Sequence, residues 1–363
     1  MRIINILFNY KKSKNSKQYL AGVERCFIDY TKYLNTGGNQ VYSVTQNNTV
    51  YRDEIKKISP DFLEVSAFSK GDVISILRIT FLFYKFNPDV VICHSGRALF
   101  FALAARFLSR RKPKIVGIDH GSNPTKFIKA DYVLTVNSYF SNELIKAGMP
   151  KDRAFVVPNM IETPADFKPA VKPSFSNPVK LGALGRVGPE KSFHMILLAM
   201  KILKERGIEC KFEIGGVGGA EKDLIDLAKK LELENSFKIL GWINDKRKFF
   251  NSIDIFILPS LAETFGIVLL EAMLYSTPII SSNSWGPNDI IEDGFNGLKI
   301  PVENQLEVPK LLANAIERMI KNEGEAKKMA DNAYHQFFEK YSAQTVGEKL
   351  NEIMNMINNK NNL

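Results

Sequence analysis

Cysteine is scarce in this sequence, and no two cysteines lie close together along the chain. The only three are Cys26, Cys93 and Cys210, and no C-x-x-C motif occurs. Small secreted domains held by disulfides have many more cysteines at short, regular spacings. The sequence therefore argues against a disulfide framework and predicts reduced, packed thiols in a cytoplasmic protein.

Long hydrophobic runs are also missing. A helix needs about 18 or more consecutive apolar residues to span a bilayer, and no uninterrupted apolar stretch approaches that length. The segment Met1–Phe8 is short and is interrupted by a polar residue. This pattern predicts a first β-strand rather than a signal peptide.

Negative charge is sparse in the first half of the chain. Residues 1–160 hold 24 of the 49 Lys and Arg and 12 of the 39 Asp and Glu, a net charge of +12 (24 − 12). The remaining 25 basic and 27 acidic residues give −2. A basic half can face nucleic acid, an anionic membrane or an acidic acceptor. No nucleic-acid-binding motif is present, so we expect no nucleic-acid partner.

The sequence is rich in apolar segments that alternate between strand-like and helix-like patterns. Its 363 residues, 45% of them hydrophobic, are enough for two domains with separate cores. Alternation of this kind predicts α/β domains with doubly wound parallel sheets. We expect a first domain at 1–165, a proline-rich linker at 161–178 and a second domain at 179–341. A last helix at 342–358 is expected to cross back to the first domain.

The segment Pro259–Glu271 carries the clearest chemical pattern. It follows a buried strand that ends at Leu258, and a helix is predicted from Ile267 to Tyr275. Gly266 allows a ligand to approach the backbone, and the free N–H groups at a helix start can hold an anion. Glu263 in the loop and Glu271 in the helix would then flank a phosphate cradle and accept hydrogen bonds from sugar hydroxyls. The alternative is a buried helix with two ordinary glutamates.

A second chemical pattern follows the strand predicted at Leu181–Leu184. Arg186 and Lys191 lie in the loop and at the start of the next helix. An arginine fork can bind two phosphate oxygens, and a lysine adds a point charge, so the pair suits a diphosphate. On its own, the pair could equally be surface charge.

These two patterns together resemble the family-four retaining glycosyltransferases. Glu263 and Glu271 are separated by seven residues, as in the E-x7-E signature of that family, and Gly185–Lys191 keeps its G-R-x-x-x-x-K motif. The resemblance implies the GT-B fold, in which two Rossmann-like doubly wound parallel-sheet domains face each other across a cleft. It also implies a donor-binding set and a catalytic set. The donor-binding residues are Gly22, Arg186, Lys191, Ile243, Glu263, Thr264, Phe265, Gly266, Ile267, Val268 and Glu271, and the catalytic residues are His120, Glu263, Arg186 and Lys191.

Two histidines lie at the ends of predicted strands, where open α/β sheets bind ligands. His120 is followed by Gly121, and the resemblance implies that it contacts the donor sugar. His94 ends a neighbouring strand, and its role is left open. Near the N-terminus the family usually has two glycines where this chain has Ala21 and Gly22. His194 and His335 are expected to be structural.

The resemblance implies transfer of a hexosyl or N-acetylhexosaminyl group from a UDP- or GDP-sugar to a glycan or lipid-linked acceptor. Lipopolysaccharide, capsule or another cell-surface polysaccharide would be the product. No D-x-D motif occurs, so no metal and no other cofactor are expected, and Gly216–Glu221 fails the nicotinamide fingerprint. A nucleotide-sugar epimerase and an inactive nucleotide-sugar-binding protein remain as alternatives.

Two predicted helices of the first domain combine apolar and basic residues. Ile74–Phe86 contains Arg78 and Lys85, and Ala98–Ser109 is followed by the basic run Arg110–Lys114. Such a run can complement the helix dipole, or it can attract anionic lipid headgroups. Peripheral binding to the inner face of the cytoplasmic membrane is therefore a second hypothesis beside a fully cytoplasmic location.

Overall fold

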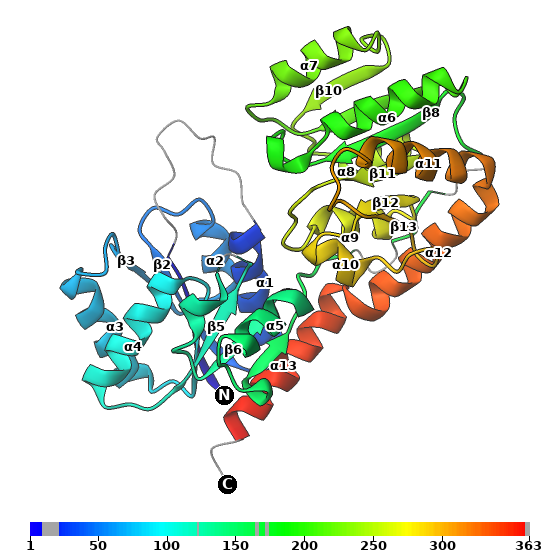
Figure 1. The fold of residues 1–363 in the computed structure, drawn as a ribbon. Helices are drawn as coiled ribbons and strands as arrows, with labels where there is room; N and C mark the ends of the chain where they lie inside the picture. The colour runs from blue at the N-terminus through cyan, green and yellow to red at the C-terminus, as the bar shows by residue number, and fades with distance from the viewer. Residues whose placement is uncertain (9–21, 122, 164–166, 171–173, 360–363) are drawn as a thin grey trace. The chain divides into compact units, whose positions relative to one another are not determined.

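The structure is a computed structural model that describes residues 1–8, 22–121, 123–163, 167–170 and 174–359 (Figure 1). The chain forms two compact units. Unit 1 comprises Met1–Glu162 and Ala343–Leu363, and unit 2 comprises Thr163–Ser342. The first unit thus ends three residues before the expected boundary at 165, and the last helix belongs to it.

Unit 1 contains a parallel sheet of seven strands in the order β3-β2-β1-β4-β5-β6-β7. Its central strands β1, β4 and β6 are almost wholly buried because helices cover both faces of the sheet. The strands are β1 (Arg2–Leu7), β2 (Gln40–Gln46), β3 (Phe62–Val65), β4 (Val90–Cys93), β5 (Lys114–Asp119), β6 (Tyr132–Thr135) and β7 (Ala154–Val156).

The helices of unit 1 divide between the two faces of its sheet. Apolar side chains of α3 and α4 form the core on one face, and those of α1 and α13 form the core on the other. The α-helices are α1 (Gly22–Thr36), α2 (Arg52–Ile58), α3 (Val73–Phe86), α4 (Gly96–Ser109), α5 (Ser138–Lys146) and α13 (Ala343–Asn359), with 3-10 turns η1 (Pro124–Phe127) and η2 (Lys151–Arg153).

Unit 2 contains a parallel sheet of six strands in the order β10-β9-β8-β11-β12-β13. The strands are β8 (Val179–Leu184), β9 (Cys210–Gly215), β10 (Phe237–Gly241), β11 (Ile255–Leu258), β12 (Ile279–Ser282) and β13 (Leu298–Ile300). The helices are η3 (Pro189–Lys191), α6 (His194–Glu205), α7 (Glu221–Lys230), α8 (Lys246–Ser252), α9 (Ile267–Leu274), α10 (Trp285–Ile290), α11 (Val308–Lys321) and α12 (Glu323–Lys340).

Both sheets reverse their winding direction at one point. In unit 1, β1 pairs with β4, and in unit 2, β8 pairs with β11. The connections on the two sides of such a point leave the sheet in opposite directions, which opens a crevice at the carboxyl ends of the two strands. These two positions are therefore where ligand sites are expected in sheets of this topology.

The expected linker at 161–178 is largely anchored where the structure describes it. The backbone N–H of Phe175 donates to Glu323 Oε1 at 3.1 Å, and that of Ser176 donates to Asp254 Oδ2 at 3.1 Å. Both acceptors belong to unit 2, so Phe175 and Ser176 are part of that unit. The sequence did not indicate this, because the proline-rich segment around them has no helix or strand periodicity. Residues 164–166 and 171–173 of this segment lie outside the described residues.

Within the described ranges, none of the helices combines the length and the hydropathy that crossing a membrane would require.

Candidate active site

Two of the expected site residues, Lys191 and Glu263, meet at the switch point of unit 2. Lys191 ends η3 in the segment after β8, and Glu263 lies in the loop after β11. Lys191 Nζ donates to Glu263 Oε2 at 2.5 Å, and the two side chains are only 19% and 12% exposed. The pairing of β8 with β11 brings these residues together, so a cation and a carboxylate stand side by side at the carboxyl edge of the sheet.

The backbone around this pair is shaped by glycines. Gly266 is the N-cap of α9 and has a left-handed backbone conformation (φ 89°), which residues other than glycine rarely adopt. At Gly216, a Cβ would lie 1.8 Å from the carbonyl oxygen of Gly185, so the loops after β8 and β9 touch through their backbones. The Glu263 carbonyl accepts from the N–H of Gly286 at 2.9 Å. The loop carrying Glu263 is thus held by two contacts, the ion pair with Lys191 and the hydrogen bond from Gly286.

The second glutamate of the motif lies inside α9 and faces a cation from another helix. Glu271 Oε2 is 3.2 Å from Nζ of Lys246, the first residue of α8, and the Glu271 side chain is 19% exposed. Burial raises the pKa of the Glu271 carboxyl, and the nearby Lys246 opposes that rise. Sequence reasoning missed Lys246 because nothing in its own segment links it to α9.

The other predicted donor-site residues of unit 2 differ in accessibility. The Arg186 side chain is 76% exposed and forms an ion pair with Glu190 at 2.7 Å. The Phe265 ring is buried and packs edge-on against Tyr341, so only its backbone can serve a ligand. Thr264, Ile267 and Val268 are partly buried, and the side chain of Ile243 lies over Gly215 at the end of β9.

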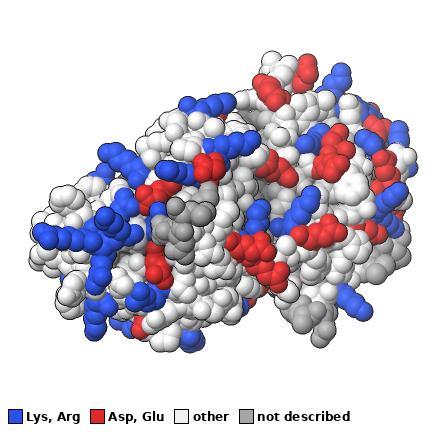
Figure 2. Space-filling view, turned by 90° about the horizontal axis from the view of Figure 1, so that it is seen from below, with Lys and Arg blue, Asp and Glu red and all other residues white. Residues whose placement is uncertain are grey.

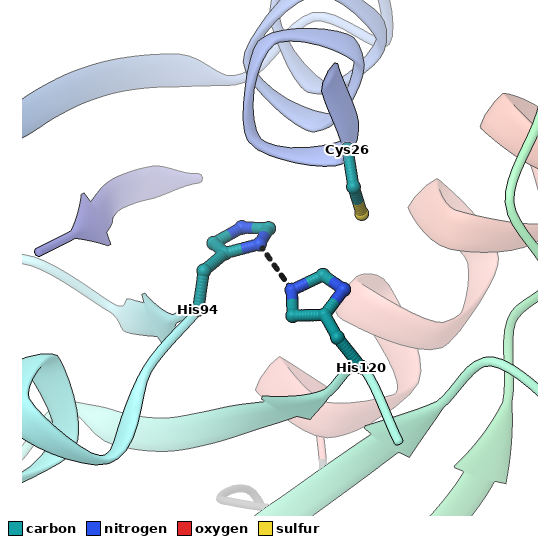
Figure 3. Close-up of side chains that lie close together, drawn as sticks. All are labelled: Cys26, His94 and His120. Atoms are coloured by element: carbon teal, nitrogen blue, oxygen red, sulfur yellow. Dashed lines mark hydrogen bonds between the residues drawn. The ribbon is translucent and has the colours of Figure 1, made fainter. Parts of the chain in front are cut away.

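In unit 1, two of the four histidines of the chain form a pair. His94 follows β4 and His120 follows β5; these strands are neighbours, so their ends lie side by side (Figure 3). His94 Nδ1 is 3.3 Å from His120 Nε2, and the rings stack with centroids 5.4 Å apart. His94 is buried against the edges of Phe27 and Tyr30, whereas His120 keeps part of its surface exposed.

The surroundings of the pair keep both imidazoles neutral. Burial and the neighbouring His120 lower the pKa of His94 well below its usual value, and burial lowers the pKa of His120 to about 4. Among the described residues, His94 Nε2 has no hydrogen-bond partner. A proton there would be a buried donor without an acceptor, so we place it on Nδ1, which donates to His120 Nε2. His120 then presents an N–H at Nδ1.

A third residue completes this cluster. The sulfur of Cys26, on α1, and one ring nitrogen of each histidine all lie within 4.8 Å of one another (Figure 3). A thiolate and two imidazoles are ligands that zinc accepts. Burial raises the pKa of the Cys26 thiol well above its usual value, so the sulfur is protonated at neutral pH. Sequence reasoning treated Cys26 only as a packed thiol, because its partners come from two distant strand ends.

Gly22, the remaining predicted site residue, is the first residue of α1 and is exposed. The basic loop before it, including Ala21, lies outside the described residues. His194 begins α6 and His335 is exposed on α12, which leaves His94 and His120 as the two histidines at strand ends.

The histidine pair predicts an acid-sensitive unit 1. A pKa near 4 in the folded state, below about 6.5 in the unfolded state, means that the unfolded chain binds more protons between these values. Stability is therefore fully present above pH 6.5 and falls as the pH drops toward 4, by about 1–3 kcal/mol for the partly exposed His120. Denaturant unfolding at several pH values between 4 and 6.5 measures this loss. The unfolding free energy of His120→Gln should depend less steeply on pH than that of the wild type. His335→Gln is the control, and an unchanged slope for His120→Gln would contradict the assignment.

Two family models match this chain. "Glycosyltransferase Family 4" matches residues 20–164, and "Glycosyl transferases group 1" matches residues 165–336. One curated relative is the "Putative colanic acid biosynthesis glycosyltransferase WcaL" of Escherichia coli, 25% identical over 63% of this chain and 61% of its own length. Another is the "Capsular polysaccharide biosynthesis glycosyltransferase CapM" of Staphylococcus aureus, 21% identical over 90% of this chain and 92% of its own.

The coverage of the relatives varies. Besides the 61% for WcaL, this chain spans 43%, 42% and 58% of the length of the three curated relatives that follow it. Among solved structures, HepE of Anabaena in complex with UDP has a TM-score of 0.78 at 18% identity and covers 98% of this chain and 100% of its own. The same protein with UDP-glucose gives 0.74. The expected pair of Rossmann-like, doubly wound parallel sheets is confirmed, and the chain belongs to the family-four glycosyltransferases of GT-B fold.

Proposed function

We propose that this protein transfers a sugar from a nucleotide-diphosphate donor, a UDP- or GDP-sugar, to a glycan or lipid-linked acceptor. The observation that carries the proposal is the Lys191–Glu263 pair, held beside the glycine-capped start of α9 at the switch point of unit 2. This arrangement offers a diphosphate a cation and backbone N–H groups, and it offers a sugar a carboxylate.

The relatives support a role in cell-surface glycan synthesis. WcaL and CapM carry names from colanic acid and capsular polysaccharide biosynthesis, and HepE was solved with UDP and with UDP-glucose. We propose the same class of product for this chain, with lipopolysaccharide as a further member, and a hexosyl or N-acetylhexosaminyl group as the one transferred. The three free, buried cysteines fit a cytoplasmic location.

In the proposed reaction, the bond between the anomeric carbon and the diphosphate breaks and negative charge develops on the leaving group. Lys191, Arg186 and the N–H groups at the start of α9 would stabilise that charge. These groups already supply positive potential, so we propose that no metal bridges the diphosphate. Activity should then persist after treatment with a chelator.

The two glutamates would orient the donor. Lys191 and Glu263 satisfy each other in the absence of a ligand, so donor binding would move the lysine to phosphate and free the carboxylate for hydroxyls of the transferred sugar. Glu271 would accept hydrogen bonds from the ribose hydroxyls. His120 is proposed to contact the donor sugar through its N–H. The acceptor oxygen would bond to the anomeric carbon on the same face from which the diphosphate leaves, so the anomeric configuration would be retained. An oxygen of the leaving phosphate would take the proton of the acceptor hydroxyl.

Two other functions could use the same kind of site. A nucleotide-sugar epimerase would change the donor without an acceptor, and an inactive binding protein would only hold it. We expect a thermal-shift screen to identify a UDP- or GDP-sugar that raises the melting temperature, because a ligand bound only to the folded state stabilises it.

The identified donor, radiolabelled in the sugar, then distinguishes a transferase, an epimerase and an inactive binding protein. A transferase should convert the label only when a lipid or glycan acceptor fraction is added. Conversion without an acceptor would indicate epimerisation, and binding without any conversion would indicate an inactive protein. A screen in which no nucleotide sugar stabilises the protein would contradict the proposed donor class.

A further inference from the structure

Helix α3 exposes an apolar stripe that the described residues of its own unit leave uncovered. The helix buries Ile79, Leu82 and Phe83 against the sheet, as an amphipathic helix should. A second apolar stripe faces solvent, with Ile74 73% exposed and Phe81 65% exposed. Leu77 and Tyr84 share this stripe at helical spacing and are also exposed. A helix of a folded domain normally has polar side chains on this side, so the stripe is unusual.

The stripe lines a groove. A hollow of about 480 Å³ lies between α3 and strands β2 and β3, and its apolar lining comprises Tyr42, Leu63, Ile74, Leu77, Phe81 and Leu82. Arg78 and Lys85 stand on the same groove and are exposed. The apolar surface is therefore concave, and two cations are part of its lining.

The end of α4 extends this surface with more positive charge. Arg110, Arg111 and Lys112 directly follow α4, and the Arg111 guanidinium lies 5.3 Å from the centre of the Tyr84 ring. That contact joins the basic run to the stripe on α3. Phe107 and Leu108, exposed on the last turn of α4, lie directly before the run.

Negative charge is nearly absent from this part of the chain. Residues 66–118 contain nine Lys and Arg and two Asp, a net charge of +7 (9 − 2). Both acids already accept hydrogen bonds within unit 1: Asp72 caps α3 by accepting from the N–H of Ser75, and Asp89 accepts from the N–H of Arg2. Figure 2 shows blue side chains gathered at the left end of the molecule, where Figure 1 draws α3 and α4.

We propose that this face, formed by the α3 stripe and the basic run after α4, docks on the surface of an anionic lipid bilayer. Apolar and aromatic side chains mixed with Lys and Arg are the composition of interfacial helices, whose apolar residues enter the headgroup region while the cations contact anionic lipid. A second copy of this chain would bring equal positive charge to the same face and be repelled. A nucleic acid would leave the aliphatic side chains uncovered. The inference does not depend on the proposed donor or acceptor.

Flotation of the full-length protein with lipid vesicles tests the charge. Vesicles of phosphatidylcholine mixed with phosphatidylglycerol should carry the protein, and vesicles of phosphatidylcholine alone should not. The triple variant Arg110→Gln, Arg111→Gln and Lys112→Gln should partition about a hundredfold more weakly, from the contribution expected of each basic residue near the surface. The control, Lys222→Gln, Lys229→Gln and Lys230→Gln on α7, removes the same charge from unit 2 and should bind as the wild type does.

The apolar stripe is tested separately. Ile74→Ser with Phe81→Ser should weaken partitioning at least about tenfold, and binding should become more sensitive to salt because mainly screened attraction remains. Both side chains are exposed, so circular dichroism should be unchanged. The matched control is Ile225→Ser with Leu306→Ser, which replaces two exposed apolar residues of unit 2.

Three results would overturn the proposal. The protein could bind equally well to vesicles without anionic lipid, or the α7 control could lose as much binding as the triple variant. The third is a concentration-dependent dimer, seen by sedimentation, that the Ile74 and Phe81 changes abolish. In that case a second copy of the chain covers the face.

Discussion

Lys191→Ala is expected to lower sugar transfer by about 10²–10³-fold, the usual loss when one group that stabilises developing negative charge is removed. Lys191 is the least exposed cation placed at the proposed diphosphate site, and it is fixed at the switch point of unit 2 by Glu263. Arg186, the other cation of the proposed site, is 76% exposed and pairs with Glu190 instead, so it is not expected to replace Lys191. Steady-state kinetics with the donor found by thermal shift would measure the loss.

The Lys191 change also leaves the Glu263 carboxylate, only 12% exposed, without its cation, which costs stability as well as activity. The double variant Lys191→Met with Glu263→Gln removes both charges and should recover stability in denaturant unfolding without recovering transfer. That outcome separates the catalytic effect from the folding effect. Lys211→Ala, an exposed lysine near the amino end of β9, is the control and should leave both quantities unchanged.

Arg186 gives a companion test with less risk to the fold. Its side chain is largely exposed and its ion pair with Glu190 is on the surface, so Arg186→Ala should change stability by less than about 1 kcal/mol. Transfer should still fall clearly because the variant removes the second cation of the proposed diphosphate site. Full activity in either Arg186→Ala or Lys191→Ala would show that the diphosphate binds elsewhere.

Glu271→Ala should weaken donor binding by roughly 10- to 150-fold, the equivalent of a charged hydrogen bond of about 1.5–3 kcal/mol. In the proposed reaction the ribose stays bound while the anomeric bond breaks, so KM for the donor should rise while kcat changes less. Calorimetric titration with UDP and with GDP measures the same loss without any acceptor.

Two variants help to interpret the Glu271 result. Glu271→Gln keeps an oxygen acceptor of the same size and should lose less affinity than the alanine variant. Glu205→Ala removes a carboxylate that is 64% exposed on α6 and should bind nucleotide normally. An unchanged affinity in Glu271→Ala would mean that its role is only to pair with Lys246.

The sequence predicted the elements well where local pattern decides them. The strand predicted at Leu181–Leu184 lies within β8, and the helix predicted from Ile267 to Tyr275 is α9, which ends one residue earlier at Leu274. Ile253 belongs to the apolar run that ends at Leu258, yet β11 begins only at Ile255. The carboxylate of Asp254, between them, accepts from the N–H groups of Ser176 and Lys180. That contact joins segments far apart in the sequence, and no local pattern records it.

The sequence by itself determined the alternation of strands and helices, the spacing of Glu263 and Glu271, and the basic character of the first half. These are properties of short segments, set by periodicity and residue type. Only the tertiary structure decided which side chains meet: Lys191 with Glu263, Lys246 with Glu271, and Cys26 with the two histidines. Each of those contacts depends on the order of strands in a sheet or on the packing of separate helices, and the residues around either partner carry no signal for them.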